Sequence, residues 1–386
     1  MNIKNLIRST GLALLFSTAM AHAADAPPTH DRTLYEAVQV ARQMMASKDI
    51  YDRILAAGAL SDVGDTKALE VLQRCLTVDD TVVQRSAIDT LITATHPNSI
   101  DLLFKTASER PEVLALMAES LASVPRDDMG ELLVKALHQE SDFVKRHALQ
   151  ALVRARGADE SVELQKLLAE PKSSNVIKAY ASYALLAEGH KERGKDFVKA
   201  ATSGNADIRE VAAVALGLVD SKDARSALKQ LAKEKDTRVA LAAVASHAGL
   251  GDEDSQGRII QTIGYGTPME ATVMAGALKR LPPKMALQLT QALIGCCKLK
   301  GDAATRVLES WGFINADATS VYAWGLNHAE ADVRMQTIWM IGQRKDANAI
   351  PLLKPFLTDE DPGIRGMAAW SIIHMNGGQY VEGIET

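Results

Sequence analysis

Residues that could carry out chemistry are few and scattered in this chain. After residue 23 the sequence contains eight histidines, namely His30, His96, His138, His147, His190, His247, His328 and His374. No histidine lies three or four residues from another, so no pair can clamp a metal ion from one face of a helix. The sequence also lacks a Cys-x-x-Cys pair, a Gly-x-Ser-x-Gly motif and a glycine-rich phosphate loop. We therefore expect no catalytic residue, no metal site and no cofactor.

The cysteines do not suggest a fold held together by disulfides. The chain has three, Cys75, Cys296 and Cys297, whereas small disulfide-rich domains have more, usually in even numbers. We expect Cys296 and Cys297 to be two small apolar residues of one helix, because adjacent helical residues rarely reach disulfide geometry. The glycine-rich segment "IGYGTP" (263–268) is expected to form an irregular turn rather than a ligand loop.

Tryptophan is the residue type with an unusual spacing. Three of the four tryptophans each follow an arginine by five residues: Trp311 follows Arg306, Trp339 follows Arg334 and Trp370 follows Arg365. Tyr183 follows Lys178 by the same interval, whereas Trp324 does not fit the spacing. Large aromatic side chains are favoured anchors in binding surfaces. The spacing raises the question of which elements would place these rings together.

The basic residues belong to a repeat that runs along the chain. Each copy has an Asp or Asn, an apolar residue, a basic residue and an alanine-rich run, as in "DIREVAAVALG" (207–217). The basic positions are Arg53, Arg85, Lys145, Lys178, Arg209, Arg238, Arg306, Arg334 and Arg365. Most steps are 28 to 33 residues, and each of the two long gaps contains a degenerate copy, "PEVLALMAESLA" (111–122) or "MEATVMAGALKRL" (269–281). A period of this length is typical of a repeat architecture.

A second amphipathic segment lies between neighbouring copies, as in "DTKALEVLQRCL" (65–76). Its apolar residues recur with the period of a helix, and an Asp or Asn before it can cap the helix. No segment shows sustained period-two alternation. The sequence therefore predicts an all-α fold of about eleven helical hairpins.

The repeat resembles the HEAT-like repeats that are also found in bilin lyases. The resemblance covers residues 33–376, preceded by a flexible lead-in (24–32) and followed by a tail (377–386). It implies a right-handed α-solenoid in which the first helix of each hairpin lines the convex face and the second lines the concave face. It also implies that the Asp and Arg residues pair between neighbouring repeats as a ladder.

The helical register predicts which way the tryptophans point. In "DIREVAAVALG" the apolar residues define a core direction near −75° from Arg209, while the position five residues on lies at about 140°. The positions one, five and nine residues after the basic residue form one stripe, which is turned away from the core. The stripe adds Met335, Gln343 and His374 to Trp311, Trp339, Trp370 and Tyr183. We expect these seven residues to line a concave aromatic groove; the alternative is that each indole packs against the neighbouring helix.

The N-terminus carries an export signal. Lys4 and Arg8 precede the apolar run "GLALLFSTAM" and the Ala21-His22-Ala23 cleavage site, so residues 1–23 are expected to be a signal peptide. Removing it leaves 41 basic and 48 acidic residues, a net charge of −7. An acidic protein is a poor nucleic-acid binder. We expect a periplasmic protein with no membrane span.

Two functions fit these features. The first is a non-catalytic scaffold or adaptor that binds a protein partner of the cell envelope in the concave groove. The alternative is a bilin-lyase-like enzyme or a tetrapyrrole chaperone, which would hold a flat ligand against the tryptophans with Cys296 or His374 nearby.

Overall fold

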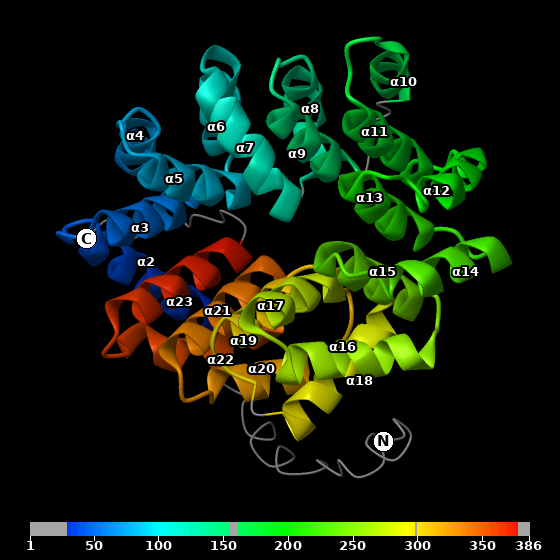
Figure 1. The fold of residues 1–386 in the computed structure, drawn as a ribbon. Coiled ribbons are helices and arrows are strands. Elements are labelled where there is room, and N and C mark those ends of the chain that lie inside the picture. Colours follow the sequence, from blue (N-terminus) through cyan, green and yellow to red (C-terminus); the bar gives the residue numbers. More distant parts are fainter. Residues whose placement is uncertain (1–28, 125, 155–160, 298, 377–386) are drawn as a thin grey trace. The chain divides into compact units, whose positions relative to one another are not determined.

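The computed structural model describes residues 29–124, 126–154, 161–297 and 299–376 (Figure 1). The proposed signal peptide, most of the lead-in and the tail lie outside these residues. Within them the chain forms 22 α-helices and five short 3₁₀ segments, with no strand. The prediction of an all-α fold is confirmed. No helix in the described part is long and apolar enough to cross a membrane.

The α-helices pair into eleven consecutive hairpins, as the repeat predicted. We call the first helix of each hairpin A and the second B. The hairpins fall into two compact units, one formed by residues 66–258 and the other by residues 1–65 and 259–386. The two units are described separately below.

Unit 2 (66–258) begins with helix α4. Its helices are α4 (Thr66–Cys75), α5 (Thr81–Thr93), α6 (Pro97–Glu109), α7 (Pro111–Ser123), α8 (Gly130–Leu137), α9 (Asp142–Leu152), α10 (Ser161–Ala169), α11 (Asn175–Ala187), α12 (Gly194–Ala200), α13 (Ala206–Leu216), α14 (Lys222–Leu231) and α15 (Thr237–Gly249). The short segments η1 (Asp127–Met129) and η2 (Lys191–Arg193) precede α8 and α12. From α5 to α15 each B helix contacts the next, which is the stacking of an α-solenoid.

Unit 1 contains the first and the last hairpin of the described residues. Its helices are α2 (Thr29–Met44), α3 (Ile50–Asp62), α16 (Glu253–Tyr265, which crosses the unit boundary), α17 (Pro268–Ala277), α18 (Pro283–Cys296), α19 (Gly301–Trp311), α20 (Thr319–Leu326), α21 (Ala331–Gln343), α22 (Ile350–Leu353) and α23 (Pro362–Met375). Three 3₁₀ segments flank them: η3 (Leu278–Arg280), η4 (Ala347–Ala349) and η5 (Lys354–Thr358). The B helices α17, α19, α21 and α23 stack in order.

The first hairpin of the chain packs against the last one. Both α2 and α3 contact α23, so α3 follows α23 in the row of B helices (Figure 1). Helix α2 begins at Thr29, inside the segment expected to be a flexible lead-in. The exposed apolar end that a terminal repeat would otherwise present at α23 is therefore covered by residues near the start of the chain.

The Asp and Arg of each repeat act mainly within their own helix start. Asp49, Asp80, Asp236 and Asp361 cap B helices by accepting hydrogen bonds from backbone N–H groups. Four arginines each donate from Nη1 to the carbonyl oxygen six residues earlier: Arg53, Arg209, Arg334 and Arg365. The predicted ladder between repeats has a rung at Arg238, whose Nη1 lies 3.0 Å from Asp207 Oδ1. Arg209 also pairs with Glu234 of the next repeat, at 2.9 Å. For Arg53, Arg334 and Arg365 the ladder expectation is wrong, because each folds back onto the loop before its own helix.

Close packing between B helices explains the small residues in the repeat. A Cβ added at Gly342 on α21 would lie 2.7 Å from Ser371 Oγ on α23. The same hydroxyl donates a hydrogen bond of 2.9 Å to the carbonyl of Ile338. A glycine at this position therefore lets the two helices approach closely enough to share a buried hydrogen bond.

Candidate functional site

Trp311 lies in the core and does not line a groove. Its side chain is fully buried, and its Nε1–H donates to Thr290 Oγ1 at 3.0 Å. Arg344 covers the ring at 5.9 Å from its centroid and donates to the Trp311 carbonyl oxygen at 3.0 Å. The prediction that Trp311 is exposed in an aromatic row is therefore wrong.

The cause is a shift in register at Arg306. Arg334 and Arg365 stand four residues after the N-cap of their helices, Glu330 and Asp361, whereas Arg306 stands six after Lys300. Arg306 does not make the bond of the repeat arginines to the preceding loop; it pairs with Glu309 in its own helix. Counting from Arg306 thus misplaced Trp311 by two residues, or about 200° around the helix, which moves it from the stripe into the core.

Trp370 has the predicted register but is also buried, with 3% of its surface exposed. It stacks on His374 at a centroid distance of 4.8 Å, and His374 Nδ1 lies 3.1 Å from Asp62 Oδ2 on α3. Four residues before Trp370, a Cβ on Gly366 would overlap Met44 of α2. The first hairpin therefore covers this whole stripe of α23. The prediction that Trp370 and His374 line an open groove is wrong because α2 and α3 pack against α23 there.

The remaining stripe residues of α21 do lie at the surface. Met335, Trp339 and Gln343 are each half-buried and follow one another at intervals of four residues. Phe313, just after α19, meets Trp339 edge-on at a centroid distance of 6.2 Å. We call these four residues the Trp339 patch. Phe313 was not predicted from the sequence, although it stands thirteen residues after its N-cap, as Gln343 does in the next repeat.

The Trp339 patch is built over Gly312. A Cβ on this glycine would lie 3.1 Å from Trp339 Cζ3 and 3.4 Å from Gln343 Cγ. Trp339 and Gln343 therefore both rest on a backbone position with no side chain. This contact fixes the indole on one side and leaves its other side half-exposed.

Polar groups lie within the patch and beside it. Gln343 Oε1 is buried and has no hydrogen-bond partner in the described part of the chain. Lys279 Nζ lies 5.6 Å from the centroid of the Phe313 ring and 3.9 Å from Glu309 Oε1. An acceptor, a donor and an aromatic pair are the groups that a polypeptide segment needs for recognition, because each peptide unit offers one N–H and one C=O.

Tyr183 belongs to the other unit and is considered separately from the patch. It is half-buried on α11, in the register that the sequence predicted. On the same helix, burial raises the pKa of Tyr180, whose hydroxyl accepts a hydrogen bond of 3.2 Å from Gln150. Nine residues after the N-cap, where α11 has Tyr183, α5 has Asp89 and α7 has Glu119, and Glu119 pairs with Arg85 at 2.7 Å. The stripe in unit 2 is therefore mostly polar.

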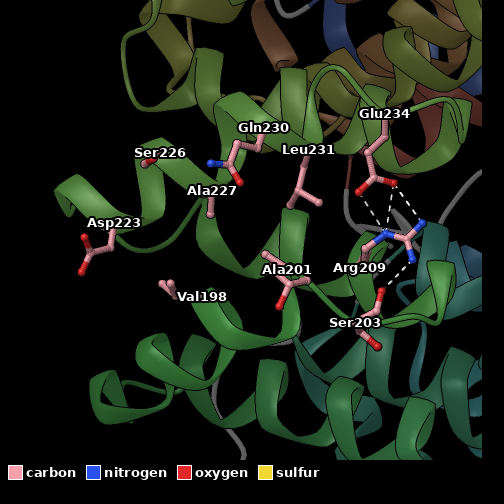
Figure 2. Close-up of a pocket in the computed structure, with 11 residues that line it drawn as sticks. Val198, Ala201, Ser203, Arg209, Asp223, Ser226, Ala227, Gln230, Leu231 and Glu234 are labelled. Atoms are coloured by element: carbon pink, nitrogen blue, oxygen red, sulfur yellow. Dashed lines mark hydrogen bonds and ion pairs between the residues drawn. The ribbon is translucent and has the colours of Figure 1, made fainter.

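A surface pocket of about 540 Å³ lies in unit 2, between α12 and α14 (Figure 2). At one end of it, Arg209 Nε lies 3.0 Å from both carboxylate oxygens of Glu234. Arg209 also donates to the carbonyl of Ser203 at 2.7 Å (Figure 2). The arginine is thus fully engaged by its neighbours, and the lining contains no histidine or cysteine. We see no arrangement for catalysis in this pocket.

The cysteine pair differs from expectation. Cys296 and Cys297 form a disulfide, because α18 ends at Cys296 and Cys297 leaves the helix in an extended conformation. The expectation of two small residues on one helix is wrong for this reason. The described residues contain no group of three or more His, Cys, Asp or Glu able to hold a metal ion.

Comparison with known proteins identifies the repeat. Residues 320–381, which run from the second residue of α20 past the end of α23, match the family of HEAT repeats. No curated protein matches the chain.

Among solved structures the chain is similar to several helical proteins at low identity. One is an engineered protein of the Northeast Structural Genomics Consortium, with a TM-score of 0.27 and 18% identity over 89% of this chain and 99% of that one. Another is the complex of CpcE and CpcF of phycocyanin lyase from Nostoc sp. PCC7120, with a TM-score of 0.38 and 18% identity over 64% of this chain and 96% of that one. A third is a structure of Kap95p with RanGDP, with a TM-score of 0.30 and 15% identity over 89% of this chain and 55% of that one. These likenesses assign no activity to the chain.

Proposed function

Because this chain carries HEAT repeats, we propose that it is an exported, non-catalytic scaffold that binds a protein partner of the cell envelope. The partner would lie in a groove lined by B helices, with the Trp339 patch as its anchor. Repeat solenoids present extended surfaces that suit this role. The proposal rests on the residues of the patch, because HEAT repeats serve many unrelated functions.

The observation that carries the proposal is the combination of groups at the patch. Trp339 and Phe313 offer half-buried aromatic surface, and tryptophan is enriched among residues that dominate binding energy. Gln343 Oε1 is a buried acceptor of the patch without a hydrogen-bond partner. An unpaired buried acceptor costs free energy, which a hydrogen bond from a bound polypeptide would offset.

The charge and the N-terminal segment support the envelope as the location. Lys4, Arg8 and the Ala21-His22-Ala23 site have the order of a cleavable export signal. The proposal expects the mature chain in the periplasmic fraction, with Ala24 as its first residue. Recovery of the uncleaved chain in the cytoplasm would contradict this part of the proposal.

The bilin-lyase-like alternative gains no specific support from the site. Of the groups suggested for it, Trp311, Trp370 and His374 are buried, and Cys296 is held in a disulfide. A tetrapyrrole would need exposed flat surface beside a reactive thiol or imidazole. Titration with biliverdin, followed by absorbance, tests this alternative; a stable complex that survives gel filtration would support it.

The scaffold proposal is tested by selecting peptides that bind the mature protein from a phage-displayed library. An enriched peptide is expected to bind Trp339→Ala at least about tenfold more weakly, because truncating a tryptophan anchor costs about 2 kcal/mol or more. Trp324→Ala is the matched control, because Trp324 is also half-buried but lies on α20, outside the patch. Equal losses in the two variants, or none in Trp339→Ala, would overturn the proposal.

A further inference from the structure

The Cys296–Cys297 disulfide cannot act as a staple for the fold. It joins residues that are adjacent in the chain, so it connects no two elements of structure. The stabilisation expected from a disulfide increases with the length of the loop that it closes. A bond across one peptide unit therefore leaves the unfolded chain almost as free as before. Its presence calls for an explanation other than global stability.

The surrounding residues are arranged to receive this disulfide. Cys297 is 5% exposed and packs against α16, where a Cβ on Gly264 would lie 2.7 Å from its Sγ. The next residue, Tyr265, directs its hydroxyl at the Cys296 carbonyl oxygen, 3.5 Å away. Gly264 and Tyr265 belong to the "IGYGTP" segment, which contains the end of α16 and the short turn into α17. The glycine therefore provides the space that the bonded sulfur occupies.

We propose that Cys296–Cys297 is a redox-active site that accepts two electrons from a dithiol reductant. Cys296 is half-buried and the more accessible of the two residues, so the reductant's thiolate attacks Cys296 Sγ. The Sγ–Sγ bond breaks, and the Cys297 thiolate leaves and takes up a proton. The second thiol of the reductant then displaces Cys296 from the mixed disulfide. The products are two protein thiols and one oxidised dithiol, so atoms, protons and electrons balance.

Reduction should act locally, on the side of α16. The segment after the disulfide is anchored independently, because His328 Nε2 lies 3.1 Å from the Leu299 carbonyl oxygen and Gly301 N–H donates to Glu330 at 2.7 Å. The turn at Gly264 and Tyr265 has no such anchor to α20 or α21 among the hydrogen bonds of the described residues. We therefore expect reduction to loosen residues 263–267 and to leave α19 unchanged.

The first test measures the state of the pair directly. Trypsin releases residues 285–298 as one peptide that contains both cysteines. After alkylation without reduction, the peptide from the purified native protein is expected to be unalkylated and two hydrogens lighter than its reduced form. Incubation of the folded protein with dithiothreitol should make both cysteines alkylatable. A doubly alkylated peptide before reduction, or resistance of the folded protein to dithiothreitol, would overturn the proposal.

The second test uses the packing of Gly264. A free Cys297 thiol can rotate away from a new methyl group, whereas the bonded sulfur cannot. Gly264→Ala is therefore expected to shift the dithiothreitol equilibrium toward the reduced form by about tenfold, which is the scale of one overpacked methyl group. Gly204→Ala is the control, because a Cβ there meets nothing within 4 Å. Equal equilibria in the two variants would contradict the proposed role of Gly264.

If Gly264→Ala does not fold, a double variant, Cys296→Ser with Cys297→Ser, provides a separate test of what the bond does. It should show the hydrogen exchange of the reduced protein, with faster exchange at 263–267 and an unchanged urea midpoint. No change in exchange on reduction, or a large fall in midpoint, would show that the bond is inert or structural. The site shares no residue with the Trp339 patch, so the two proposals can fail separately.

Discussion

The contact between Asp62 and His374 joins residues 312 positions apart and lies where the first hairpin packs against α23. Asp62 is fully buried and His374 is 2% exposed, with Trp370 stacked on the imidazole. Removing either partner breaks this buried hydrogen bond. The expected cost is about 1–3 kcal/mol in the free energy of unfolding. His374→Ala also loses the ring stacking, worth about 0.5–1.5 kcal/mol.

The assay is a double-mutant cycle with Asp62→Ala, His374→Ala and the double variant. Urea unfolding gives the stability of each, and hydrogen exchange shows whether α2 and α23 open together. The double variant should be less destabilised than the sum of the single variants by about 1–3 kcal/mol, because each single change already breaks the shared contact. His147→Ala, half-buried on α9 of the other unit, is the control and should leave α2 and α23 unaffected. If the losses in unfolding free energy of the two single variants were additive and hydrogen exchange in α2 did not change, the contact would not couple α2 to α23.

Three further predictions concern stability. Trp311→Ala should lower the free energy of unfolding by about 3–5 kcal/mol, because Trp311 is fully buried. Trp339→Ala should lower it clearly less, because Trp339 is only half-buried. Equal urea midpoints for the two variants would contradict the corrected register. Gly342→Ala should cost about 1–3 kcal/mol by displacing Ser371, as urea unfolding would show. Burial raises the pKa of Asp89 above its ordinary 3.8, so its charged form is disfavoured in the fold. Asp89→Asn should therefore raise the urea midpoint at pH 7, and the gain should disappear at low pH, where the carboxyl is protonated in the folded and unfolded states alike.

The repeat made most of the fold predictable. The period, the apolar spacing and the Asp caps gave eleven helical hairpins, and the described helices follow them. The capping Asp or Asn was expected before the A helices, whereas the structure places Asp caps before B helices, at Asp49, Asp80 and Asp361. The hairpins themselves were predictable for a local reason, because amphipathic spacing depends on residues only a few positions apart.

The candidate site was predictable only where the register of the repeat held. Trp339, Met335 and Gln343 follow the N-cap Glu330 at the predicted intervals and lie at the surface. Trp311 was misplaced because Arg306 resembles the repeat arginine in type but stands two residues later. A count from the N-cap would have avoided this error and would have found Phe313.

Two features could not be read from local sequence at all. The burial of Trp370 and His374 depends on α2 and α3, more than 300 residues away, and nothing in the repeat indicates that the first hairpin covers the last. The disulfide depends on the place where α18 ends. A helix one residue longer would have kept Cys296 and Cys297 in helical backbone, where adjacent sulfurs rarely meet.

The central claim is that a protein partner contacts the B-helix face at the Trp339 patch. Its most direct test is site-specific photocrosslinking in the periplasm, with p-benzoylphenylalanine at Gln343 and, as control, at Leu352, which is 46% exposed on α22. We expect one discrete partner to be crosslinked from position 343 and none from position 352. The crosslink from position 343 should be lost when Trp339 is replaced by Ala. Crosslinking at position 352 alone, or at both positions regardless of Trp339, would contradict it.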